Sequence, residues 1–195
     1  MFLNCHSYHS LRYGTISVEQ IVQQASDLGV AVLALTDINT ITGIYEFHKL
    51  CLKNNIKPVV GVEVRDNDKL LYICLAKNKN GIGEINRLLT QHNCDGVELP
   101  EQHPKFTDVI VIYTLDNFPE KLHRNEYIGV RPEELNLLVN SKLKTNIPKM
   151  VVLQPVTFRT KQEYNLHKIL RAIDNNTLVS KLNESDYCKD FERFT

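Results

Sequence analysis

The sequence contains no tryptophan and only 2 methionines, and it has no excess of charge of either sign. Lysine and arginine number 23 against 23 aspartates and glutamates, so the formal net charge is +0 and the isoelectric point is about 7.0. A domain that grips DNA by itself carries a basic patch and a high isoelectric point. The balanced charge therefore excludes that class, and any nucleic-acid role must be local or depend on other chains or domains.

Two further absences concern the cell compartment. The chain has no Cys-x-x-Cys pair, and its cysteines are odd in number: Cys5, Cys51, Cys74, Cys94 and Cys188. This usage predicts reduced, mostly buried thiols rather than a disulfide framework. No apolar run approaches the roughly 18 residues of a membrane span, and the N-terminus lacks the pattern of a signal peptide. We therefore expect a cytoplasmic protein without a membrane segment.

What the sequence does contain is enough apolar material for one folded domain. Its 195 residues are 43% hydrophobic, and a chain of this length buries roughly 70% of the surface that its unfolded form exposes. No stretch has the composition of a linker between domains. We predict a single domain over residues 1–195, with a C-terminal stretch that lacks an obvious terminal cap.

Hydrophobic periodicity predicts strands and helices in alternation. Ser17 and Gln20 have the spacing of a capping box at the start of a helix, and Gly29 ends that helix. Predicted strands lie at 2–6, 30–35, 58–64, 70–76, 108–113, 127–130 and 150–153, and predicted helices lie at 17–28, 44–51, 85–89, 132–139 and 164–173. This alternation favours an α/β barrel or a doubly wound sheet.

Candidate functional residues follow from the strand ends, because barrels of this kind place functional side chains at the C-terminal ends of their strands. His6, Asp37 and Glu63 stand at three such ends and are able to bind metal. Imidazole and carboxylate ligands suit Zn, Mn or Fe, and several of them together could activate water for phosphoester hydrolysis. From the residue types and positions alone, each of these three residues is more often a strand-end polar group that accepts backbone hydrogen bonds or, for Asp37, a helix cap.

Four sequence blocks carry a resemblance to a known family. They are Leu3-Asn4-Cys5-His6-Ser7 with Gly14, Ala34-Leu35-Thr36-Asp37, Gly43-Ile44-Tyr45-Glu46-Phe47, and Ile56 to Val64. In order and spacing the chain resembles the polymerase-and-histidinol-phosphatase (PHP) domain, in the version found at the N-terminus of bacterial DNA polymerase III alpha subunits. The resemblance is strong to about residue 90 and looser afterwards. It implies a distorted (β/α)7 TIM-like barrel and a PHP module that is part of a much longer polymerase chain.

Departures from the family pattern fall on positions that bind or support metal in the family. His6, Asp37 and Glu63 match, whereas the positions of other family ligands or supporting groups hold Asn4, Tyr13, Ile38, Leu71, Pro155 and Thr157. Aliphatic side chains offer no electron pair to a metal. The resemblance therefore implies a degenerate site without catalytic residues, in which His6, Asp37 and Glu63 hold at most a single Zn or Mn ion and no other cofactor is expected.

The function implied by the resemblance is structural support for DNA-directed DNA synthesis by the rest of a nucleotidyltransferase chain. The implied partners are the remaining polymerase domains and, through the whole enzyme, the exonuclease subunit and the sliding clamp, with DNA contacted only indirectly and no membrane. One alternative is a metal-dependent phosphoesterase or a 3′–5′ proofreading exonuclease. The other is a binding protein that uses the old metal pocket for a phosphate or a nucleotide.

Overall fold

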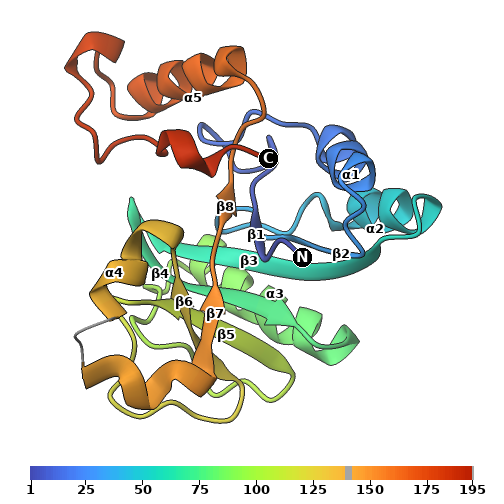
Figure 1. The fold of residues 1–195 in the computed structure, drawn as a ribbon, viewed down its shortest axis with the longest axis vertical. Helices are drawn as coiled ribbons and strands as arrows, with labels where there is room; N and C mark the ends of the chain where they lie inside the picture. Colours follow the sequence, from blue (N-terminus) through green and yellow to red (C-terminus); the bar gives the residue numbers. More distant parts are fainter. Residues whose placement is uncertain (139–141, 195) are drawn as a thin grey trace.

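The computed structural model describes residues 1–138 and 142–194, which form a mixed α/β fold around a curled sheet (Figure 1). Six strands make this sheet in the order β2-β3-β4-β5-β6-β7. Their bounds are Val32–Leu35 (β2), Lys57–Asp66 (β3), Lys69–Ala76 (β4), Val109–Thr114 (β5), Glu126–Val130 (β6) and Met150–Val152 (β7). The seven predicted strands are confirmed in position, the first of them as the short β1 (Asn4–Cys5).

Strand direction departs from a strictly parallel arrangement at β4. This strand is antiparallel to both β3 and β5, whereas β2 with β3, β5 with β6, and β6 with β7 pair in parallel. Only Asn67 and Asp68 separate β3 from β4, and so short a turn can join only antiparallel strands. Asn67 adopts a positive φ of 50°, a conformation that asparagine tolerates better than most residues.

A second, two-stranded sheet pairs the start of the chain with a late segment. β1 runs parallel to β8 (Pro155–Val156), with Asn4 opposite Pro155 and Cys5 opposite Val156. β1 also lies against β2, where the Ala34 N–H donates to the Phe2 carbonyl oxygen at 3.0 Å. The sequence analysis did not predict β8, because two residues framed by Gln154 and Thr157 show no strand periodicity.

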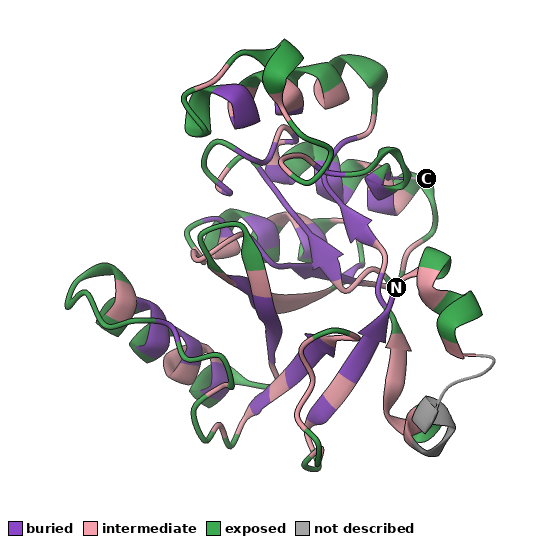
Figure 2. Cartoon of the chain, turned by 90° about the vertical axis from the view of Figure 1, so that its left-hand side faces the viewer, coloured by how far each residue is buried: buried purple, intermediate pink, exposed green. Residues whose placement is uncertain are grey.

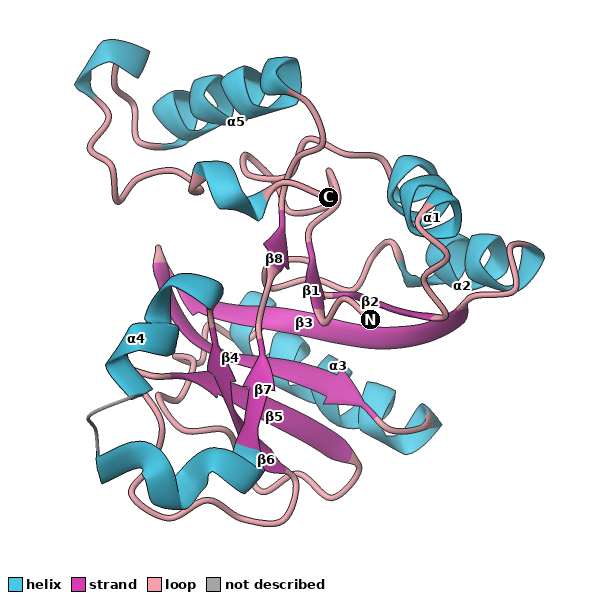
Figure 3. Cartoon of the chain, in the orientation of Figure 1, coloured by secondary structure: helices cyan, strands magenta, loops and turns pink. Residues whose placement is uncertain are grey.

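The helices lie outside the curled sheet (Figure 3). Their bounds are Val18–Asp27 (α1), Ile44–Lys53 (α2), Lys79–Asn93 (α3), Leu135–Leu138 (α4) and Lys161–Asp174 (α5), with 3-10 turns at Pro132–Glu134, Lys142–Lys149, Val179–Lys181 and Asp190–Glu192. The predicted capping box at α1 is confirmed, since Ser17 and Gln20 each bond the other's backbone N–H. Of the predicted helix at 132–139, residues 132–138 form a 3-10 turn followed by α4, and Val139 lies outside the described residues.

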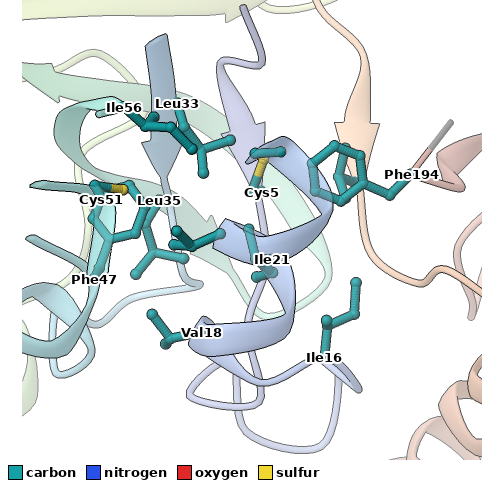
Figure 4. Close-up of a cluster of buried hydrophobic side chains, with 13 residues drawn as sticks. Cys5, Ile16, Val18, Ile21, Leu33, Leu35, Phe47, Cys51, Ile56 and Phe194 are labelled. Carbon is teal, nitrogen blue, oxygen red and sulfur yellow. The ribbon is translucent and has the colours of Figure 1, made fainter. Parts of the chain in front are cut away.

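One apolar cluster joins the first βαβα unit. α1 directs Val18, Ile21, Val22 and Ala25 inward, and these side chains pack with Leu33 of β2 and with other buried residues (Figure 4). The other labelled members come from β1, β2, α2, the C-terminal residues and the segments before α1 and β3, namely Cys5, Leu35, Phe47, Cys51, Phe194, Ile16 and Ile56. Burial is concentrated on the strands and on the inner helix faces (Figure 2).

The cysteines agree with the prediction of reduced, mostly buried thiols. All five are free, and only Cys94 is exposed. Among the described residues, no helix combines the length and the apolar character needed to cross a membrane.

Candidate functional site

Residues from both sheets meet at one buried polar site. Asn4 lies in β1, His6 follows β1 directly, and Glu63 lies inside β3 instead of at the predicted strand end, because β3 continues to Asp66; each is about 1% exposed. Oε2 of Glu63 accepts hydrogen bonds from Asn4 Nδ2 at 2.7 Å and from His6 Nε2 at 3.0 Å. Thr36 donates to Asn4 Oδ1 at 2.7 Å, which orients the Asn4 amide toward the carboxylate. The structure thus brings two of the three candidate residues, His6 and Glu63, into direct contact.

The other edge of the His6 ring is held by residues from late in the chain. The Thr157 hydroxyl donates to Glu192 Oε2 at 2.8 Å, so its oxygen accepts from Nδ1 of His6 at 3.1 Å. A carboxylate only accepts, so Nε2 also donates, to Glu63. Both ring nitrogens of His6 are therefore donors. Thr157, aligned with a family ligand position, does lie in this site.

Arg65 neutralises the remaining oxygen of Glu63. Positions 63 and 65 lie on the same face of β3, because side chains alternate along a strand. The guanidinium Nε of Arg65 donates to Glu63 Oε1, and the same guanidinium lies over the ring of Tyr13, 4.5 Å from its centroid. The Tyr13 ring in turn meets the His6 ring edge-on at 5.4 Å. Arg65 was not among the predicted site residues, because the predicted strand 58–64 ends one residue before it, whereas β3 continues to Asp66.

The electrostatics of Glu63 follow from these neighbours. Burial by itself opposes ionisation of the carboxyl group, but Arg65 and His6 outweigh burial. With the hydrogen bonds from His6 and Asn4, they hold the pKa of Glu63 well below its usual range. Arg65 thus supplies the permanent positive charge beside Glu63, and His6 and Asn4 add hydrogen bonds to the same carboxylate.

Asp37 belongs to a different cluster. Its carboxylate is 1% exposed and accepts from the Ser7 N–H at 2.6 Å, the Ser7 hydroxyl at 2.8 Å and the Ser10 hydroxyl at 2.7 Å. These three bonds hold the loop that follows β1. Asp37 is therefore not directed at Glu63, although Glu63 N–H donates to the Asp37 carbonyl oxygen at 3.2 Å through the backbone.

A pocket of about 170 Å³ opens beside the buried network. His6, Tyr13, Glu63 and Arg65 form its floor, and its wall includes Arg131, Arg171, Ser185, Tyr187, Lys189 and Glu192. Arg171, which is 4% exposed, forms ion pairs with Asp68 and Asp174. Arg65 and Arg171 are thus already paired with carboxylates. An anion that enters the pocket would have to compete with these ion pairs.

The two aliphatic replacements lie in different surroundings. Leu71 belongs to the buried cluster under α3, whereas Ile38 forms an isolated β-bridge with Glu63 and packs against the cluster that contains Tyr13 and Phe158. Among the described residues, no three His, Cys, Asp or Glu side chains are grouped so that they could hold a metal ion. The Glu63 oxygens accept from Asn4, His6 and Arg65, so the residues present do not fit a multinuclear metal centre.

Comparisons with known proteins show the family of this chain. The PHP domain family matches residues 3–120, more than half of the chain, and the chain therefore belongs to the PHP domain family. It is similar to the DNA polymerase III subunit alpha of Staphylococcus aureus (strain Mu50), with 25% identity over 190 residues that cover 95% of this chain and 18% of that protein. The corresponding subunit of Chlamydia trachomatis (serovar D) is 40% identical over 62 residues, or 32% of this chain and 5% of that protein.

The chain spans less than a fifth of the length of the Staphylococcus relative. Among solved structures, a Bifidobacterium adolescentis protein assigned as a metal-dependent phosphoesterase is 12% identical, covers 91% of this chain and 84% of its own, and has a TM-score of 0.39. An amidohydrolase from Chromobacterium violaceum is 22% identical, covers 46% of this chain and 32% of its own, and has the same TM-score of 0.39.

Proposed function

We propose that this chain is a PHP module of a replicative DNA polymerase alpha subunit, and that it supports the polymerase body instead of hydrolysing phosphoesters. The observation that carries this proposal is the buried network in which His6, Arg65 and Asn4 occupy the oxygens of Glu63. A hydrolytic metal centre needs free ligand electron pairs and a metal-bound water. Here those electron pairs accept hydrogen bonds from the chain itself.

The fold proposed for this module is the distorted (β/α)7 barrel. β7 and β8 are separated only by Leu153 and Gln154, and β8 pairs with β1, which lies against β2. The chain thus leads from β7, the last strand of the six-stranded sheet, through β8 and β1 back to β2, the first strand. This connection supports closure of the sheet into a barrel. His6 and Glu63 then lie at one end of that barrel, where this class of fold places its sites.

The proposed neighbour is the rest of a polymerase chain, as in the alpha subunits that the sequence resembles. α5 carries an apolar stripe at Leu166, Ile169 and Ile173, and the following 3-10 turn adds Leu178 and Val179; all five are exposed. Exposed apolar patches of this kind mark interaction surfaces. The exonuclease subunit, the sliding clamp and DNA would be reached through the whole enzyme, in the cytoplasm.

The test is metal content together with hydrolysis of bis-p-nitrophenyl phosphate by the purified chain with Zn²⁺ or Mn²⁺. We expect no stoichiometric metal and no activity above that of the buffer. His6→Ala is the informative variant, and His48→Ala, which removes an exposed imidazole from α2, is its matched control. Bound metal with activity that falls in His6→Ala but not in His48→Ala would overturn the proposal and establish the alternative, a metal-dependent phosphoesterase or exonuclease.

A further inference from the structure

The positive charge that faces Glu63 belongs to Arg65, a residue of the same strand, β3. Glu63 is 1% exposed and Arg65 is 13% exposed. A buried carboxylate must be paired or lose its charge, because burial removes its hydration. In a metal site the counter-charge is the ion; here the positive charge on Oε1 is the Arg65 guanidinium, and Oε2 is hydrogen-bonded to the His6 ring.

The packing of Arg65 makes it a fixed occupant of the site. Its guanidinium lies over the Tyr13 ring at 4.5 Å, and Arg171 approaches the same ring at 5.6 Å. Tyr13 is itself 7% exposed, and its ring packs edge-on against His167 at 4.6 Å. A guanidinium held between an aromatic face and a carboxylate has little freedom to move away and admit another cation.

We infer that the Arg65 guanidinium is the resident cation of this pocket, standing where a metal would otherwise balance Glu63 and excluding divalent ions from that carboxylate. This inference rests on the proposed function and deepens it by naming the residue that keeps the site metal-free. Tyr13, one of the departures from the pattern of the family that the sequence resembles, provides the ring over which the cation lies.

The experiment measures the melting temperature (Tm) of the full chain and of three variants, Arg65→Met, Glu63→Gln and the double variant, each with and without excess Zn²⁺. Removing one partner of a buried ion pair is strongly destabilising, so we expect Arg65→Met to lower the Tm by roughly 10 °C. In the Arg65→Met background, Glu63→Gln should lower the Tm by much less than it does in the wild type. Zn²⁺ should leave the wild type unchanged and raise the Tm of Arg65→Met but not of the double variant.

The matched control is the pair Lys69 and Glu101, an exposed ion pair at the start of β4. Lys69→Met with Glu101→Gln should show nearly additive effects, because exposed pairs couple weakly. If Arg65→Met does not fold, Arg65→Lys takes its place; it keeps the charge and should stay insensitive to Zn²⁺.

Two results would overturn the inference. One is additivity of Arg65→Met and Glu63→Gln to the same degree as the control pair. The other is a Zn²⁺-induced rise in the wild-type Tm that Glu63→Gln abolishes. Zn²⁺ binding that persists in Glu63→Gln but is lost in Asp37→Asn would contradict the proposed metal-free function. It would leave the pairing of Arg65 with Glu63 intact. The failure of the proposed function and the failure of this inference are therefore distinguishable.

Discussion

His167 gives the sharpest test of the folded structure, because it is a fully buried histidine with two defined hydrogen bonds. Its Nε2 accepts from the Cys188 N–H at 2.9 Å, and its Nδ1 donates to the Tyr13 carbonyl oxygen at 2.7 Å. The ring is therefore neutral, with its proton on Nδ1, and it ties α5 to the loop after β1 and to the C-terminal segment. A second ring proton would break the bond from Cys188.

Burial is the main cause that lowers the pKa of His167 from 6.5 to about 4. The positive charge of Arg171 adds to that effect, and the hydrogen bond to the Tyr13 carbonyl opposes it. Between pH 6.5 and about 4 the unfolded chain binds a proton at this residue and the folded chain does not. The free energy of unfolding therefore falls as the pH falls through this window, and His167 contributes its full stabilisation above pH 6.5. Since one pKa unit is worth about 1.4 kcal/mol, the loss at pH 4 is about 3 kcal/mol.

The perturbation is His167→Gln, and the assay is urea unfolding followed by circular dichroism between pH 7.5 and 4. At pH 7.5 we expect the variant to be less stable than the wild type by about 1–3 kcal/mol, because buried hydrogen-bonding groups lose a partner. The gap between the two proteins should narrow as the pH falls, since glutamine does not titrate. Carboxylates such as Glu63 also lower stability in acid, but they do so in both proteins.

His48→Gln serves as the control, because His48 is exposed on α2 and its removal should leave the pH profile of the wild type unchanged. Parallel pH profiles for the wild type and His167→Gln would refute the reasoning, since they would mean that His167 titrates alike in the folded and unfolded chains.

Further substitutions test the core, the sheet and the Asp37 cluster, each by its free energy of unfolding in urea. Phe47→Ala, at the fully buried centre of the α1 and α2 contact, should cost about 3–5 kcal/mol. Gly61→Ala should destabilise β3 clearly, because the added Cβ would lie 2.5 Å from the Cys74 carbonyl oxygen. Gly83→Ala in α3 meets only a side-chain atom at 3.9 Å and should be neutral or stabilising. Asp37→Ala, which leaves three donors without their acceptor, should cost about 2–4 kcal/mol, and Asp37→Asn should cost less; equal costs would contradict the role given to the carboxylate.

Local patterns were sufficient to predict the succession of elements. The capping box at Ser17 and Gln20, the helix end at Gly29 and the apolar runs of β2 to β5 depend on residues close together in the chain, so the sequence alone contains them. The family followed from blocks around His6, Asp37 and Glu63, which are also short and local. The direction of β4 was not explicit in that pattern, although the two-residue turn after Asp66 dictates it.

The sequence by itself determined the elements other than β8, the family, and the candidates His6, Asp37 and Glu63, because each depends on a short-range pattern. Only the tertiary structure decided which donors fill the lone pairs of each carboxylate. Arg65 reaches Glu63, Ser7 and Ser10 reach Asp37, and Thr157 links His6 to Glu192 from the far end of the chain. A buried carboxylate is satisfied by whichever donors the fold brings within hydrogen-bonding distance, and that distance is set by the packing of segments that are remote in sequence.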